Sequence, residues 1–339
     1  MFDTFKTQKE LAKVFAPAGR ESGLIYHLHD MAKPYADECH IDTLGNLIVR
    51  KKGGGKKIMV SAHADSIGLV ITHIEEKGLL RFCGIGGLKL ELLLGANVIF
   101  ENGTKGTVFR EAKTKLDELK EHDCFIDIGA DSRDVARKCV NIGDMAVFYA
   151  DTYQNCGKIV SPYLDDRIAC VILLQALAML GNNPVNDIYF VFSVQEEVGL
   201  RGAKTAAYAI DPDIGLAVDV TGVGDVPAQK AHINCALGKG AAIKIRDSSM
   251  ISHPGVVAWL ESTAKSAKIT VQREVLPTGG TDAGAIHISR GGVPSGGISI
   301  PTRYIHSPAE MADLSDIDAC TRLLLAALNS SAAGILTLH

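Results

Sequence analysis

Hydrophobic residues follow two different periods along the chain. Apolar positions recur every three or four residues, the spacing of an amphipathic helix, in the segments 5–15, 22–35, 166–180, 200–209, 254–268 and 315–333. Short apolar, β-branched runs typical of strands lie at 46–50, 57–61, 187–194 and 214–218. Because these strands alternate with helices, we expect an α/β fold, a mixed sheet with helices on both faces.

The segment between Gly68 and Lys158 has a different pattern. Short β-like runs alternate there with glycine and charged turns, at 69–74, 97–100, 106–109, 124–128 and 145–148. This pattern is typical of a small β-barrel or sandwich. We therefore predict a β-rich domain, residues 69–158, inserted into a discontinuous α/β domain formed by residues 1–68 and 159–339.

Charge and hydropathy exclude several classes of partner. The 339 residues carry 35 Lys and Arg against 39 Asp and Glu, a formal charge of -4, so no basic field is available for nucleic acid or an anionic membrane. The apolar run 168–180 is too short to span a bilayer, and residues 1–15 mix charges into an amphipathic pattern that does not resemble a signal peptide. We expect a soluble, cytoplasmic protein without nucleic-acid or membrane partners.

Candidate ligands follow three of the predicted strands. His63 and Asp65 come after the strand 57–61, Glu196 and Glu197 after 187–194, and Asp219 after 214–218. In α/β sheets, ligand-binding groups gather beyond the carboxyl ends of the strands. Each motif alone also fits an ordinary strand end, so their joint occurrence carries the prediction of a site.

Two loops add further candidates. Asp165 and Asp166 stand at the start of the helix 166–180, where they could equally cap it, and His306 follows near the end of the chain. The eight cysteines form no Cys-x-x-Cys pair, so neither a disulfide framework nor a thiolate zinc site is expected. Imidazole and carboxylate ligands suit one or two divalent ions such as zinc, cobalt or manganese.

The adjacent glutamates fit the chemistry of a hydrolase with two metal ions. Such a site needs carboxylates as ligands and a further carboxylate that handles the proton of the attacking water. Glu196 and Glu197 can divide these duties, because neighbouring side chains at a strand end point in different directions.

Several motifs together resemble a known family, the cytosolic dinuclear metal aminopeptidases that form tetrahedral (TET) dodecamers and include glutamyl, deblocking and FrvX-like enzymes. The resemblance covers nearly the whole chain. The motifs, in order, are AHADSIGLVIT at 62–72, LDDRIA at 164–169, VQEEVGLRGA at 194–203, AVDVT at 217–221 and GGTDAGAIHISRGGVPSGGISIPTRYIHSPAEM at 279–311.

The resemblance implies a zinc-peptidase-like fold and a pair of metal ions, zinc or cobalt with manganese as a further alternative. Asp165 would bridge the two ions. Glu197 and His306 would complete one metal site, and His63 and Asp219 the other.

The resemblance also implies roles for residues that do not bind metal. Glu196 would be the general base, and Asp65 would hydrogen-bond to His63 and fix its tautomer. The turn at Thr281 and Asp282 would form part of the wall of the active site. The inserted domain would mediate dimerisation and assembly into a homododecamer, and the substrates would be short peptides.

Two other functions remain open at this stage. The first is a metal-dependent deacylase of N-acyl amino acids, because related dinuclear hydrolases share the ligand set. The second is a binding or assembly protein that has kept these residues but lost turnover. The preferred N-terminal residue is also open: Lys244, Arg246 and Arg290 could favour acidic residues, but each could equally be a surface charge.

Overall fold

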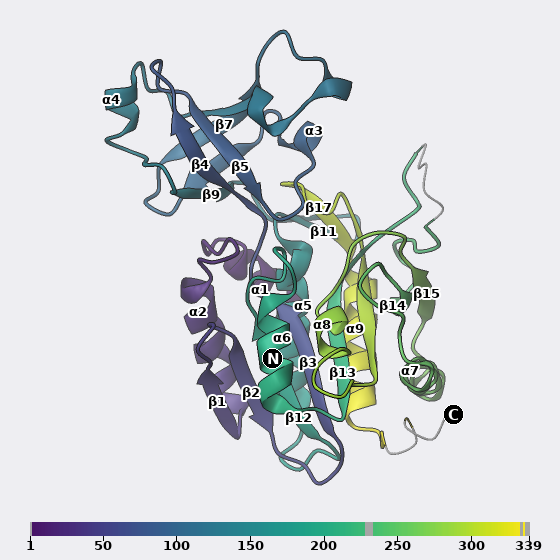
Figure 1. Cartoon of the computed structure of the whole chain (residues 1–339). Helices are drawn as coiled ribbons and strands as arrows, with labels where there is room; N and C mark the ends of the chain where they lie inside the picture. Colours follow the sequence, from purple (N-terminus) through teal and green to yellow (C-terminus); the bar gives the residue numbers. More distant parts are fainter. Residues whose placement is uncertain (1, 228–232, 333–334, 336–339) are drawn as a thin grey trace.

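A computed structural model describes residues 2–227, 233–332 and 335. Figure 1 shows a large α/β unit with a smaller β-barrel at one end of its sheet. The chain enters the barrel directly after the strand that ends at His63.

The α/β unit is built on one mixed sheet. Its strands are β1 (Glu38–Ile41), β2 (Leu47–Lys51), β3 (Lys57–His63), β10 (Tyr153–Asn155), β11 (Lys158–Ser161), β12 (Asp187–Ser193), β13 (Ile214–Gly222), β14 (Ala241–Arg246), β15 (Val271–Val275), β16 (Ser295–Arg303) and β17 (Glu310–Asp313). They run in the order β1-β2-β12-β3-β13-β16-β17-β11-β10, and β14 joins β15 to β16. The central strands β12, β3, β13 and β16 are parallel. Both faces of these strands are covered, which is why β12 and β13 are apolar almost throughout.

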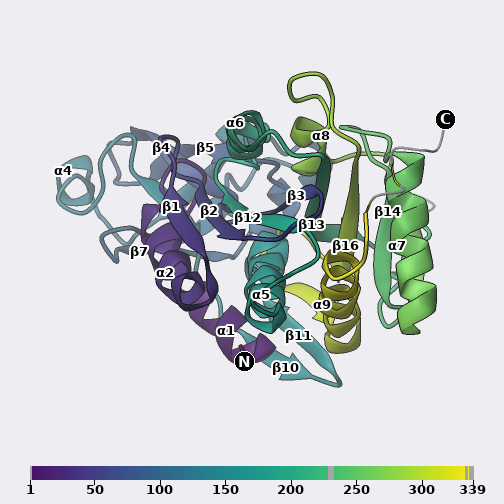
Figure 2. The same cartoon turned by 90° about the horizontal axis from the view of Figure 1, so that it is seen from below.

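Helices cover both faces of this sheet (Figure 2). One face carries α1 (Thr4–Leu11), α2 (Ser22–Ala32), α5 (Leu164–Met179) and α9 (Leu314–Leu328), and α7 (Pro254–Ala267) packs on α9 and β14. The opposite face carries α6 (Arg201–Ile210) and α8 (Ala283–Ile286). Helix α5 is buried from Leu164 to Leu177 and forms the centre of the main core. Within the described residues, no helix has the length and apolar character needed to cross a membrane.

The barrel is closed and has a core of its own. Its strands run in the order β4-β5-β8-β7-β6-β9 around the barrel. Their bounds are β4 (Gly68–Ile74), β5 (Leu80–Ile85), β6 (Asn97–Phe100), β7 (Lys105–Arg110), β8 (Cys124–Asp127) and β9 (Met145–Phe148), with the short helices α3 (Leu90–Leu93) and α4 (Arg133–Ala136) between them. Leu80, Val98, Val108 and Ile126 are fully buried inside it.

The predicted fold class is confirmed, with differences in detail. The strands β1, β5, β10, β11 and β14–β17 were not predicted; in β16 (SGGISIPTR) glycine and proline break the apolar run that would have marked it. The predicted helix 315–333 ends at Leu328, and residue 333 lies outside the described residues. The strands β10 and β11 pair in the main sheet, so the barrel strands end at Phe148. The domain boundaries at residues 69 and 158 stay a prediction.

Candidate metal centre

Divergence of two parallel strands opens a space at the carboxyl edge of the sheet. Strands β3 and β13 pair only as far as Ser61 and Ala217, and β13 then continues along β16 alone. His63 is the last residue of β3, and Asp219 lies two residues beyond the last pair. The predicted strand 214–218 is thus too short, since Asp219 lies within β13 and not after it.

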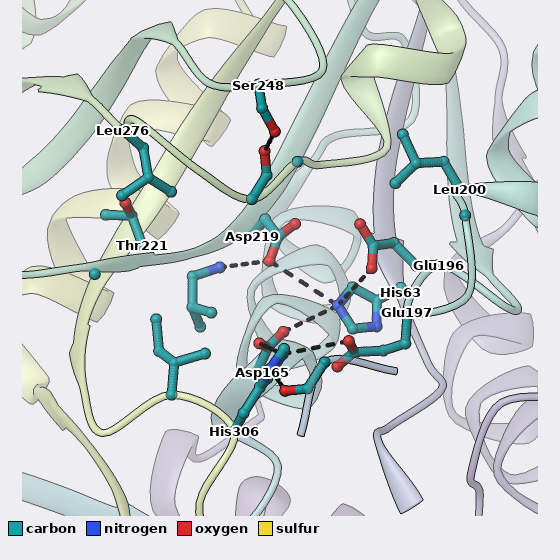
Figure 3. Close-up of a pocket in the computed structure, with 17 residues that line it drawn as sticks. His63, Asp165, Glu196, Glu197, Leu200, Asp219, Thr221, Ser248, Leu276 and His306 are labelled. Carbon is teal, nitrogen blue, oxygen red and sulfur yellow. Dashed lines mark hydrogen bonds and ion pairs between the residues drawn. The ribbon is translucent and has the colours of Figure 1, made fainter. Parts of the chain in front are cut away.

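The remaining candidates reach the same space from other elements. Asp165 comes from the irregular first turn of α5, Glu196 and Glu197 from the loop between β12 and α6, and His306 from the loop between β16 and β17. Figure 3 shows their side chains converging within one pocket. The cavity has a volume of about 420 Å³ and is lined by these residues together with Leu200, Thr221, Ser248 and Leu276.

Asp165 stands between two imidazoles. Its Oδ1 lies 3.0 Å from His63 Nε2, and its Oδ2 lies 3.2 Å from His306 Nε2. His306 Nε2 is also 3.2 Å from Glu197 Oε2. His63 Nε2 is 4.0 Å from Asp219 Oδ1 and 3.9 Å from Glu196 Oε2. Each oxygen of Asp165 therefore faces a different group of potential ligands.

In the described part of the chain, two groups of side chains have the composition and spacing of a metal site. One group is His63, Asp165 and Asp219, and the other is Asp165, Glu197 and His306. In each group the ligand atoms lie within 4.8 Å of one another. Asp165 is shared, and Glu196 belongs to neither group.

The electrostatics of this cavity favour a bound cation. Burial raises the pKa of Glu196 and of Asp219 well above the usual value, although His63 opposes both shifts. Burial alone would lower the pKa of His63, but the carboxylates of Glu196 and Asp165 raise it well above its usual value. Buried carboxylates that outnumber their cationic partners are costly unless a cation compensates them. The residues therefore fit divalent ions, which accept both imidazole and carboxylate.

Two buried carboxylates hold the backbone of the candidate ligands. Asp65 accepts hydrogen bonds from the N–H groups of Glu196 (2.9 Å) and Glu197 (3.1 Å). Its Oδ1 lies 3.6 Å from His63 Nδ1, whereas its backbone carbonyl oxygen lies 3.1 Å from that nitrogen. In this geometry Asp65 contacts the His63 ring through its main chain, and its carboxylate fixes the turn that carries both glutamates.

Glu310, on β17, holds the backbone of two other candidate ligands in the same way. One of its oxygens accepts a hydrogen bond from the N–H of Asp165 (2.9 Å) and the other from the N–H of His306 (2.8 Å). Glu310 is not among the residues predicted from the sequence. Its sequence signal is an acid four positions after His306, inside the last of the recognised motifs, but nothing in the local pattern marks that acid as buried.

Other candidates from the sequence lie outside the cavity. Lys244 is buried and paired with Glu274, and Arg290 donates to the carbonyl oxygen of Tyr208. Neither these residues nor Arg246 line the cavity, which does not favour the alternative in which one of them selects acidic N-terminal residues. The carboxylate of Asp282 accepts hydrogen bonds from the hydroxyls of Ser61 and Ser193, behind the strands that carry the site.

Comparison with known proteins places the chain in a family. The family model described as M42 glutamyl aminopeptidase matches residues 45–323. The chain belongs to this family. The membership agrees with the resemblance read from the sequence and makes the chain an aminopeptidase.

Similar proteins match along almost the whole chain. A putative aminopeptidase of Acetivibrio thermocellus is 46% identical over 328 residues, which are 96% of this chain and 98% of that protein. An aminopeptidase structure from Desulfurococcus kamchatkensis has a TM-score of 0.93 at 38% identity and covers 99% of this chain and 97% of its own. The TET1 peptidase of Pyrococcus horikoshii, which can assemble into a tetrahedron or a large octahedral shell, has a TM-score of 0.85 at 31% identity and covers 96% and 99%.

Proposed function

We propose that this M42 family member is a dinuclear metal aminopeptidase that removes N-terminal residues from short peptides. Two divalent ions would be held, one by His63, Asp165 and Asp219, the other by Asp165, Glu197 and His306. The observation that carries the proposal is the position of Asp165, whose two oxygens face His63 and His306 at 3.0 and 3.2 Å. A shared carboxylate between two ligand groups is the arrangement that a pair of ions requires.

Bound divalent ions would supply Lewis acidity for the scissile carbonyl and would lower the pKa of water. Glu196 would act as the general base: its carboxylate would accept a proton from the attacking water and donate it to the leaving amine as the C–N bond breaks. Two features support this role. Glu196 is in neither ligand group, so its carboxylate is free of metal. Burial also raises the pKa of Glu196 above the usual value for a glutamate, which brings this pKa closer to the pH at which an enzyme works.

We further propose that the ions are zinc or cobalt, with manganese as the alternative, and that the chain forms a homo-oligomer, a dodecamer built from dimers. Similarity to the TET1 peptidase of Pyrococcus horikoshii supports assembly into a closed shell. The inserted domain, residues 69–158, would form the dimer contact. Phe109, Leu116 and Tyr149 lie in this segment, and each leaves about half of its surface exposed.

The proposed function is tested with chelated enzyme to which zinc, cobalt or manganese is restored. Initial rates are measured on aminoacyl p-nitroanilides with acidic, basic and apolar side chains, and on the same compounds after N-acetylation. We expect metal to restore hydrolysis of the free-amine substrates and N-acetylation to abolish it. Hydrolysis of N-acyl amino acids without any cleavage of free-amine substrates would contradict the proposal and assign the site to a deacylase.

A further inference from the structure

A loop of the barrel lies against the second ligand group. Residues 86–89, here called the barrel loop, connect β5 to α3. The carbonyl oxygen of Gly87 accepts a hydrogen bond from Nδ1 of His306 at 2.6 Å, and Lys89 Nζ donates to the carbonyl oxygen of Ile305 at 2.8 Å. Gly87 also lines the cavity that holds the ligands. The inserted barrel thus contacts the candidate metal centre directly.

The contact at Gly87 decides which nitrogen of His306 is free. A carbonyl oxygen can only accept, so Nδ1 of His306 must carry the hydrogen. The lone pair of the neutral ring then lies on Nε2, the atom that is 3.2 Å from both Asp165 and Glu197. Such a partner of a ligating histidine fixes the ring orientation and strengthens it as a ligand.

The barrel loop can approach this closely because it begins with two glycines. A Cβ atom on Gly87 would lie 3.2 Å from Nδ1 and Cε1 of His306. A Cβ atom on Gly86 would lie 3.1 Å from Oε2 of Glu197 and 2.8 Å from Cγ2 of Ile67. Gly86 also has φ +78, a conformation that disfavours other residues. Both glycines thus leave room for ligands of the same group.

We propose that the barrel loop is a positioning element of the active site, which holds His306 and Glu197 in place for the second metal ion. The inference rests on the proposed function, because it concerns the ion assigned to Asp165, Glu197 and His306. It assigns the inserted barrel a role in metal binding in addition to the proposed role in assembly. Among the described residues, neither His63 nor Asp219 makes a hydrogen bond or ion pair with this loop, so the ion that they would hold serves as an internal reference.

Matched glycine variants separate this role from a general loss of backbone freedom. Gly86→Ala is compared with Gly129→Ala, because both glycines have φ +78 but a Cβ on Gly129 would meet nothing within 4 Å. Gly87→Ala is compared with Gly54→Ala, whose Cβ would also lie in open space. Lys89→Met removes the contact with Ile305 from an exposed position, and Lys89→Arg keeps a donor there.

Zinc binding to the chelated full-length variants is measured by calorimetry, and cobalt binding by the visible spectrum, alongside kcat. We expect Gly86→Ala, Gly87→Ala and Lys89→Met to lower the affinity for one of the two ions by about 10- to 100-fold. This is the usual effect of losing the hydrogen-bond partner of a metal ligand. The other ion should bind unchanged, excess zinc should restore kcat, and Lys89→Arg and the control glycines should match the wild type.

Two outcomes would overturn the inference in distinguishable ways. If the wild type binds two ions and all three loop variants bind both with wild-type affinity, the barrel loop does not position the site although the proposed function stands. If the wild type itself binds fewer than two ions, the proposed function fails first. If the two glycine variants do not fold, the comparison of Lys89→Met with Lys89→Arg decides alone.

Discussion

The different roles proposed for the adjacent Glu196 and Glu197 predict different effects of the same substitution. Glu196→Gln keeps the size and shape of the side chain but removes its ability to take a proton. The turn should stay in place, because its backbone N–H groups are bonded to Asp65 and not to the side chain that changes. Glu196 is in neither ligand group, so the variant should still bind two ions.

The expected magnitude follows from the proposed role. Glu196 Oε2 lies 3.9 Å from His63 Nε2, so a water that occupies the cavity between the ligand groups is within its reach. A positioned general base contributes about 10²- to 10⁴-fold to the rate. At about 1.4 kcal/mol for each factor of ten, Glu196→Gln should raise the barrier by about 3–6 kcal/mol.

The neighbouring position provides the matched control. Glu197→Gln makes the same chemical change one residue further along the same turn, but it removes an anionic ligand from the group that contains His306. The assay combines metal content after dialysis, zinc calorimetry and kcat on a free-amine p-nitroanilide. Glu196→Gln should lose kcat with both ions retained, and Glu197→Gln should lose an ion. The assignment would be refuted if Glu196→Gln lost an ion. It would also be refuted if Glu196→Gln retained more than about a tenth of the wild-type kcat.

Three further predictions concern packing, support and protonation. In Gly202→Ala the new Cβ would lie 2.4 Å from the carbonyl oxygen of Val194, so we expect the variant to be destabilised by about 1–3 kcal/mol. The destabilisation is measured as a lower Tm, and Gly291→Ala, whose Cβ would meet nothing within 4 Å, is the control. Glu310→Gln leaves one of two buried backbone N–H groups without an acceptor and should weaken zinc binding by about 10- to 100-fold in calorimetry, whereas unchanged affinity would deny Glu310 a supporting role. Burial lowers the pKa of His306, but neighbouring carboxylates outweigh it and raise the pKa to about 12. The metal-free protein should therefore release a proton from His306 when zinc binds, and its affinity for zinc should rise with pH. Calorimetry in buffers of different ionisation enthalpy measures this proton release. An affinity for zinc that does not depend on pH would contradict the prediction.

The sequence predicted the fold class because its strongest signals are long and periodic. Helix α5 and strands β3 and β12 are apolar runs with clear ends, and they carry or precede His63, Asp165 and Glu196. Strands such as β1, with the sequence ECHI, are short and half exposed, so no run of apolar residues marks them. Glycine and proline conceal β16 in the same way, although it is a central strand.

The candidate ligands could be predicted because their chemistry is local, whereas their supports could not. His63, Glu197 and Asp219 stand at or near strand ends that a parallel sheet brings to one edge. Gly87 and Glu310 act through contacts with residues far away or on another element, and the distance from Gly87 to His306 along the chain exceeds 200 residues. No periodic pattern records such a contact, so only the tertiary structure reveals it.

The buried acids of the site differ in the groups that their carboxylate oxygens contact. Asp65 and Glu310 each accept hydrogen bonds from two backbone N–H groups. Such bonds favour the charged carboxylate, although at Glu310 burial outweighs them and raises the pKa to about 8. Asp165 and Glu197 instead face imidazole nitrogens across the cavity, and one oxygen of Glu197 has no hydrogen-bond partner among the described residues. Both oxygens of an acid of the first kind are occupied by backbone donors, whereas an acid of the second kind directs its oxygens into the cavity, where a bound cation would meet them. On this criterion the two kinds of acid, which are alike in the sequence, differ in their proposed roles: the first kind holds the backbone of the site, and the second would hold the proposed metal ions.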